Sequence, residues 1–130
     1  MIRRFLPVAF LLAFLAVASG CRTAPVYNVS NAPIPAGAGG VSMDDMKSAI
    51  VGAGAGLGWQ MKAVEPGKVL GTLNLRSHMA QVSITYNTET YNIRYQNSAN
   101  LKYNGETIHQ NYNGWVQRLD GAIQSRLASM

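Results

Sequence analysis

Apolar and polar residues alternate along the chain from residue 59 to residue 96, which is the period of a β-strand with one buried and one solvated face. Short polar connections separate the alternating runs. One of them, Glu65-Pro66-Gly67-Lys68, has proline and glycine at the positions that a type II turn requires. We therefore expect an antiparallel meander of four strands. The predicted strands cover residues 59–63, 69–76, 80–86 and 91–96.

The hydrophobic period becomes helical on both sides of this region. Ser42 is a typical helix N-cap, Asp45 stands three residues later as in a capping box, and apolar residues recur at helical spacing from Met43 to Ala53. We expect this short helix to end in the glycine-rich run at 52–58, which also favours close backbone packing. A longer apolar stripe predicts a second helix of about twenty residues. The stripe consists of Ile108, Tyr112, Trp115, Leu119, Ala122, Ile123 and Leu127.

An apolar helix stripe and a sheet with one apolar face are each unstable alone, so they are expected to bury each other. The sequence therefore predicts an α+β fold. It consists of an antiparallel four-stranded meander with an N-terminal helix and a longer C-terminal helix packed on one face. Trp59 and Trp115 are expected to be core anchors between these layers.

The first 21 residues follow a different pattern. Arg3 and Arg4 precede an uninterrupted apolar run at 5–18, which has the length of a signal-peptide h-region. As a helix this run would cover roughly 21 Å, which is too short for the roughly 30 Å hydrocarbon core of a membrane. The run leads into Ala18-Ser19-Gly20-Cys21, which resembles the lipobox of bacterial lipoproteins.

In bacterial lipoproteins the lipobox cysteine receives a diacylglyceryl group, the leader is cut before it, and the new amine is acylated. The resemblance implies that residues 1–20 are a lipoprotein signal peptide and that Cys21 is the lipidation site. An ordinary secretory leader is the alternative. However, Cys21 is the only cysteine, so it would then have no disulfide partner in an oxidising compartment. Arg22-Thr23, with no aspartate after the lipid site, implies an outer-membrane lipoprotein whose domain faces the periplasm.

Removal of the leader leaves about 110 residues, enough for one domain with a modest core. Residues 21–41 are rich in proline, alanine and glycine and predict a lipid-anchored flexible tether with a span of roughly 25 Å. Within it, we expect residues 26–29 either to add a short edge strand or to pack on the domain, which covers residues 42–130. Without Arg3 and Arg4 the net charge falls from +5 to about +3, which gives no indication of nucleic-acid binding.

The solvated face of the predicted sheet is the main candidate for a binding surface. Its hydroxyl, amide and guanidinium groups suit an envelope protein or a cell-wall glycan, and the alternative is a solvated face without a ligand. A second candidate is an unpaired sheet edge that accepts a partner strand. The predicted surface, which we call the polar sheet face, comprises Thr72, Asn74, Arg76, Gln81, Ser83, Thr85, Asn92, Arg94 and Gln96.

Catalytic chemistry is weakly indicated. His78 and His109 lack the spacing of a zinc site, the chain has no G-x-S-x-G motif, and Cys21 is assigned to lipid. We therefore expect no metal, no cofactor and no enzymatic activity. The alternative is a small enzyme or ligand-processing accessory that uses His78 or His109, and two histidines meeting in one pocket would favour it.

The mature chain contains the segments Gly58-Trp59, Pro66-Gly67, Leu75-Arg76-Ser77-His78, Ile84-Thr85-Tyr86, Tyr91-Asn92-Ile93-Arg94-Tyr95, Ser98-Ala99-Asn100-Leu101 and Ile108-His109-Gln110-Asn111-Tyr112-Asn113-Gly114-Trp115. Together they resemble a family of small uncharacterised proteobacterial envelope lipoproteins, over roughly residues 26–128. The resemblance implies the extent of the domain and an envelope location, but no activity. We therefore expect a membrane-anchored lipoprotein that acts as a non-catalytic binding or scaffolding module.

Overall fold

A computed structural model describes residues 22–35 and 40–130 of the chain. The predicted signal peptide and Cys21 lie outside these residues. The described residues form seven strands and two helices. In chain order the elements are β1 Thr23–Pro25, β2 Val29–Pro33, α1 Met43–Gly56, β3 Gln60–Glu65, β4 Lys68–Leu75, β5 His78–Tyr86, β6 Thr90–Ala99, β7 Thr107–His109 and α2 Gln110–Ala128.

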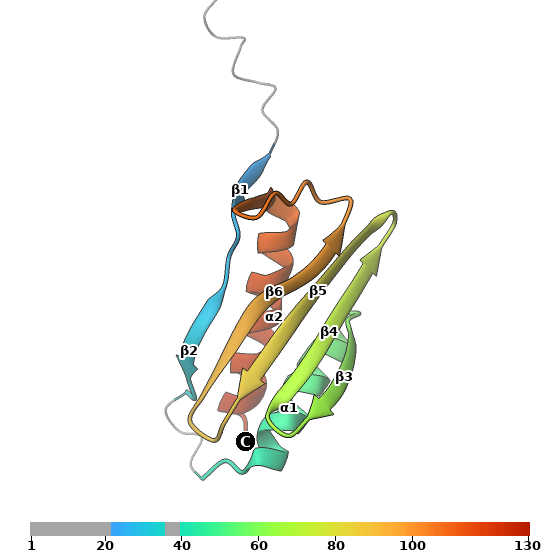
Figure 1. Cartoon of the computed structure of the whole chain (residues 1–130). Helices are drawn as coiled ribbons and strands as arrows, with labels where there is room; N and C mark the ends of the chain where they lie inside the picture. The colour runs from blue at the N-terminus through green and yellow to red at the C-terminus, as the bar shows by residue number, and fades with distance from the viewer. Residues whose placement is uncertain (1–21, 36–39) are drawn as a thin grey trace, which may run out of the picture.

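The main sheet has five antiparallel strands in the order β2-β6-β5-β4-β3, and both helices lie on the same face of it (Figure 1). The α+β architecture is as predicted, and β3 to β6 follow one another as a meander. The predicted strand number is wrong, because β2 adds a fifth strand beside β6, with Val29 opposite Ile93 and Pro33 opposite Thr90. The alternation of apolar residues does not reveal β2, because Val29 is the only buried residue among its five.

The chain before α1 is folded onto the domain at residues 22–35. The expected flexible tether over residues 21–41 is therefore wrong for this part, while residues 36–39 lie outside the described residues. Strand β1 pairs antiparallel with β7, and the Gln110 N–H donates to the Arg22 carbonyl oxygen at 2.8 Å. Backbone pairing needs no apolar period, so a segment rich in proline and alanine forms it without a signal in its side chains.

Both expectations for residues 26–29 are met in part. The Tyr27 N–H donates to Asn113 Oδ1 of α2 at 2.9 Å, and Val26 and Tyr27 pack against the core. Val29 is buried and begins β2. The segment thus packs on the domain and also leads into an edge strand.

Helix α1 begins and ends as predicted. The Ser42 side chain accepts from the Asp45 N–H and the Asp45 carboxylate accepts from the Ser42 N–H, each at 3.0 Å, which forms the expected capping box. The helix ends at Gly56, within the glycine-rich run at 52–58. A Cβ atom at Gly54 would overlap the Met61 side chain of β3. Gly54 therefore allows close helix-to-sheet packing inside the helix, as the glycine-rich run led us to expect.

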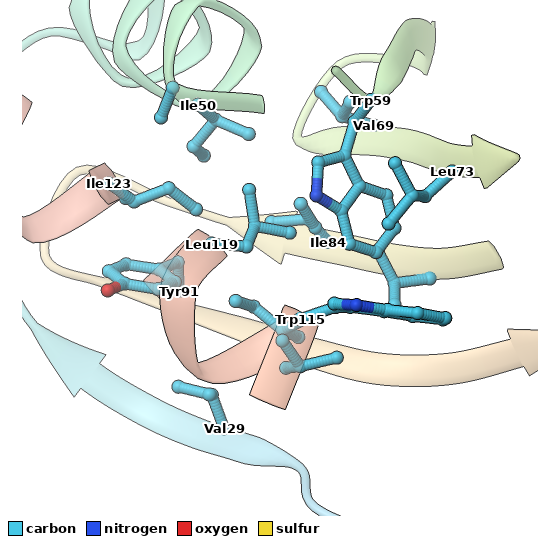
Figure 2. Close-up of a cluster of buried hydrophobic side chains, with 14 of the residues drawn as sticks. Val29, Ile50, Trp59, Val69, Leu73, Ile84, Tyr91, Trp115, Leu119 and Ile123 are labelled. Carbon is cyan, nitrogen blue, oxygen red and sulfur yellow. The ribbon is translucent and has the colours of Figure 1, made fainter. Parts of the chain in front are cut away.

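The core lies between the two helices and the inner face of the sheet. Figure 2 shows Ile50 of α1, Leu119 of α2 and Ile84 of β5 pointing into the same cluster. Trp59 and Trp115 are 4% and 9% exposed, which confirms them as core anchors. Full burial of one large apolar side chain contributes about 1.5–3 kcal/mol, so this one-sided layer supplies the main stabilisation of the sheet.

Two hairpin turns set the register of the strands. Glu65 is paired with Lys68 and Gly67 has a φ of 81°, as the type II turn requires. In the two-residue turn between β4 and β5, Arg76 has a φ of 59°, in the left-handed region that favours glycine. Arg76 therefore belongs to a turn at the end of the sheet, and its assignment to the polar sheet face is wrong.

Candidate functional site

The polar sheet face lies on the side of the sheet opposite the helices. Antiparallel register places directly opposed residues on the same side of the sheet, so the polar residues of β4, β5 and β6 meet as cross-strand pairs. Asn74 adds an exposed amide near the end of β4. The predicted residues that the register brings together are Thr72 with Gln81, Ser83 with Arg94, and Thr85 with Asn92.

Hydrogen bonds between side chains organise part of this face. Gln81 Nε2 donates to Thr72 Oγ1 at 3.1 Å, and Asn92 Nδ2 donates to Thr85 Oγ1 at 3.3 Å. The Asn92 side chain also accepts from the Asn31 N–H of β2 at 2.8 Å. These bonds restrict the orientations of the Gln81 and Asn92 amides, so these side chains would lose little conformational entropy if a ligand bound there.

The structure adds residues that the predicted face does not include. One row of paired residues crosses β3, β4, β5 and β6. It consists of Lys62, Leu70, Ser83 and Arg94, in that order. This row therefore has a cation at each end. The alternation of residues 60–63 is enough to place Lys62 on the polar side of its strand. Its position in one row with Arg94 follows only from the strand register.

Gln96 departs from its predicted place because β6 contains an irregularity. Gln81 pairs with Asn97 while Val82 pairs with Tyr95, so Gln96 is an extra residue in β6. A bulge of this kind shifts the alternation of all later residues in the strand. Asn97 therefore takes the position opposite Gln81 that the simple alternation gave to Gln96.

An open hollow of about 650 Å³ lies beside the end of β6 and the connection to β7. The Tyr95 and Tyr103 rings stack with their centroids 4.0 Å apart, and Tyr103 is 40% exposed. Tyr95 Oη and Ser98 Oγ share a hydrogen bond of 2.7 Å. The sequence shows this connection only as a polar segment. The lining residues are Tyr95, Gln96, Asn97, Ser98, Asn100, Leu101, Lys102 and Tyr103.

Both histidines take part in local structure. His109 is the N-cap of α2, where its Nδ1 accepts from the Asn111 N–H at 3.1 Å. His78 Nδ1 lies 2.8 Å from the Asn100 carbonyl oxygen, which can only accept, so Nδ1 carries the donated proton. The His78 ring also lies 6.4 Å from the Trp115 ring. Neither histidine lines the hollow beside β6.

Two buried tyrosines differ in how their hydroxyl groups are satisfied. The Tyr91 hydroxyl donates to the Asp120 carboxylate and accepts from Gln124 Nε2 at 2.8 Å. The Tyr112 hydroxyl has no hydrogen-bond partner among the described residues. Burial raises the pKa of both phenols above the ordinary value, and the hydrogen bond to Asp120 further raises the pKa of Tyr91. Both side chains are therefore neutral at physiological pH.

The sheet has two edges among the described residues, β2 and β3. Strand β3 exposes most of its length, including Val64 at 40% exposure. Lys62 lies within this edge strand, and a lysine at such a position disfavours pairing between copies of the chain. The second candidate surface, an unpaired sheet edge, is thus β3 or β2.

Residues 22–35 and 40–130 contain no group of three or more side chains that could hold a metal ion. Neither α1 nor α2 is long and apolar enough to cross a membrane. Comparison of the chain with protein-family models, with curated proteins and with solved structures found no match.

Proposed function

We propose that the chain is a lipid-anchored protein of the bacterial envelope, acylated at Cys21, whose domain binds a cell-wall glycan without catalysis. The polar sheet face is the proposed binding surface. The signal-like sequence at 1–20 and the residues after Cys21 support a position at the outer membrane, facing the periplasm. The proposal also gives the lone thiol a role, because acylation removes its reactivity.

The one-sided covering of the sheet is the observation that carries the proposal. Both helices pack on the inner face, and the opposite face of β3 to β6 remains open to solvent (Figure 1). Amides that are fixed by Thr72 and Thr85 lie beside Arg94, which is exposed. A glycan presents many hydroxyl groups, and fixed amides and hydroxyls can donate to them and accept from them.

Charge favours a glycan that carries anionic groups. Lys62 and Arg94 end the row that crosses the four strands, and Lys68 is in register with Thr85 in a neighbouring row. A guanidinium group binds a carboxylate through two parallel hydrogen bonds. Arg94 is therefore the proposed contact for an acidic group of the cell wall.

The histidines give no support to an enzymatic role. His109 uses Nδ1 as a helix cap, and His78 uses Nδ1 to hold the Asn100 carbonyl. Each ring thus has a role in holding the fold. A binding or scaffolding module is the function that this geometry supports.

The proposed function can be tested by co-sedimentation of the full-length protein with purified cell-wall sacculi. Arg94→Glu is expected to weaken binding at least about tenfold, because a hydrogen bond to a charged group contributes roughly 1.5–3 kcal/mol. Lys47→Glu makes the same charge change on an exposed position of α1 and is expected to bind as the unmodified protein does. Equal binding of Arg94→Glu and Lys47→Glu would show that the polar sheet face is not the glycan site.

One further outcome would redirect the proposal. If the domain binds an envelope protein and Arg94→Glu abolishes that binding, the polar sheet face remains the binding surface and the ligand is a protein.

The lipid anchor has a test of its own. Mass spectrometry of the protein from the membrane fraction is expected to find acyl groups on an N-terminal Cys21, and a Cys21→Ser variant is expected to leave that fraction. An unmodified cysteine would contradict the lipid anchor.

A further inference from the structure

The folded domain begins directly after the proposed acylation site. The Arg22 carbonyl oxygen already accepts from the Gln110 N–H at 2.8 Å, and Thr23 is paired with His109 in the β1–β7 ladder. Two residues of chain reach at most roughly 7 Å. If Cys21 carries the acyl groups, the end of the domain that contains β1 is held at the membrane surface.

Three segments from distant parts of the sequence form this end of the domain. Figure 1 shows the β1–β7 pair, the connection from β6 to β7 and the turn from β4 to β5 at the same end of the sheet. Hydrogen bonds tie the turn to the connection, since Asn100 Nδ2 donates to Ser77 Oγ and His78 Nδ1 donates to the Asn100 carbonyl, both at 2.8 Å. The Val26 N–H donates to the Glu106 carbonyl at 3.1 Å. We call this surface the β1 end.

The β1 end is basic. Arg22 before β1, Arg76 in the β4–β5 turn and Lys102 in the β6–β7 connection are all exposed, and Glu106 is the carboxylate in the same connection. The opposite end of the sheet in Figure 1 contains the start of α1, the β3–β4 turn and the β5–β6 turn. These opposite segments carry the acidic residues Asp44, Asp45, Glu65 and Glu89 together with Lys47 and Lys68, so that end has no excess of positive charge.

Exposed apolar side chains accompany these cations. Tyr103 is 40% exposed and Leu75 is 44% exposed, and aromatic residues of this kind are enriched where a protein meets lipid headgroups. Arg76 and Lys102 also have φ values of 59° and 57°, in the left-handed region. Non-glycine residues in that region persist where surrounding structure holds them, and they cluster at functional sites.

We propose that the β1 end docks on a membrane leaflet that contains anionic phospholipid, and this proposal rests on the acylation of Cys21. Arg22, Arg76 and Lys102 contact lipid phosphates, while Tyr103 and Leu75 enter the headgroup layer. The strands then run away from the membrane, and the polar sheet face stands upright with its surface open to the periplasm. This arrangement replaces a domain on a long tether by a domain of fixed orientation.

The test uses the mature acylated protein, which begins at Cys21, reconstituted in vesicles of phosphatidylethanolamine with phosphatidylglycerol or in vesicles of phosphatidylcholine alone. A fluorophore is attached to Ala99→Cys at the end of β6 or to Thr88→Cys in the β5–β6 turn. A nitroxide on the lipid headgroup quenches fluorophores that lie close to the membrane. We expect strong quenching at residue 99 and weak quenching at residue 88 in the anionic vesicles.

Charge reversal provides the matched comparison. Arg76→Glu with Lys102→Glu is expected to lower the docking equilibrium constant at least about thirtyfold in anionic vesicles. Each cation near an anionic leaflet raises the affinity about fivefold, and two cations are lost. Lys47→Glu with Arg126→Glu makes the same charge change away from the β1 end and is expected to leave quenching unchanged. Thermal unfolding of both variants establishes that they are folded.

The possible outcomes distinguish the docking of the β1 end from the acylation of Cys21. Equal quenching at residues 99 and 88, with the protein retained on both kinds of vesicle, would overturn docking and leave the lipid anchor intact. Quenching that is the same in anionic and neutral vesicles would overturn the role of the cations. If the protein without an added cysteine reacts with the thiol fluorophore at Cys21 and is retained on neither kind of vesicle, the lipid anchor is wrong and the docking inference fails with it.

Discussion

Tyr91 and Tyr112 form a natural comparison, because both are fully buried at 0% exposure and only the Tyr91 hydroxyl has hydrogen-bond partners among the described residues. Replacing Tyr91 by phenylalanine removes a donor to Asp120 and an acceptor from Gln124. A hydrogen bond to a charged group contributes roughly 1.5–3 kcal/mol, and the Asp120 carboxylate loses a partner. We expect Tyr91→Phe to lower the free energy of unfolding by about 2 kcal/mol.

Tyr112→Phe makes the same chemical change at a hydroxyl without a partner among the described residues. A buried polar group that lacks a hydrogen bond lowers stability by about 1–3 kcal/mol, so its removal relieves part of that loss. We expect Tyr112→Phe to leave the free energy of unfolding unchanged or to raise it by about 1 kcal/mol.

Equilibrium unfolding in urea measures both variants against the unmodified protein. A loss of about 2 kcal/mol corresponds to a fall of about 8 °C or more in Tm for a domain of this size. The slope of the unfolding free energy against urea concentration should be the same in all three proteins. An unchanged slope establishes that the substitutions changed the stability and not the two-state behaviour. If Tyr112→Phe destabilises the domain as much as Tyr91→Phe, the loss of stability does not follow the hydrogen bonds of the two hydroxyl groups, and the reasoning is refuted.

Two further predictions concern alkaline pH and the helical glycines. Burial raises the pKa of Tyr91 and Tyr112 in the folded protein, so the folded state keeps protons that the unfolded state releases, and stability is expected to fall as pH rises above about 10. Urea unfolding across that range should show a shallower fall in Tyr91→Phe, and an equal fall would contradict the assignment. Gly54→Ala is expected to lose about 1–3 kcal/mol because its Cβ meets Met61. Gly121→Ala, whose Cβ meets nothing within 4 Å, should gain up to about 1 kcal/mol, and equal melting temperatures for the two would count against close α1 packing.

The candidate site was predictable from sequence to the extent that it follows the alternation within single strands. Thr72, Gln81 and Arg94 were placed on one face because each stands between apolar neighbours. The bulge in β6 places Asn97, and not Gln96, opposite Gln81. An extra residue in a strand inverts the alternation of the residues after it, and no residue type in the sequence marks that position. Arg76 was assigned to a strand because alternation alone does not show where a two-residue turn begins.

The hollow beside β6 and the β1 end could not be predicted from the sequence for a different reason. Tyr95 and Tyr103 stack across a connection whose conformation includes left-handed residues at Asn100 and Lys102. Asparagine often adopts this conformation but lysine does not, so the sequence marks only one of the two positions. The segments that carry Arg22, Lys102 and Arg76 lie at one end of the domain only because β1 pairs with β7.

The sequence by itself determined the parts of this protein that depend on neighbouring residues. The capping box of Ser42 and Asp45, the type II turn at Gly67 and the one-sided burial of β4 to β6 each follow from local chemistry or from a short period. The lipobox-like end of the apolar leader is likewise local, and its role stays a prediction.

Only the tertiary structure decided how the chain before α1 is used. Strands β1 and β2 gain their stability from hydrogen bonds to β7 and β6, which lie far along the sequence, and backbone groups are the same in every residue. Prolines and alanines that suggested a flexible tether therefore form part of the domain. The same pairing places the folded domain next to the proposed lipid anchor, so long-range backbone pairing, and not composition, sets the distance between the two.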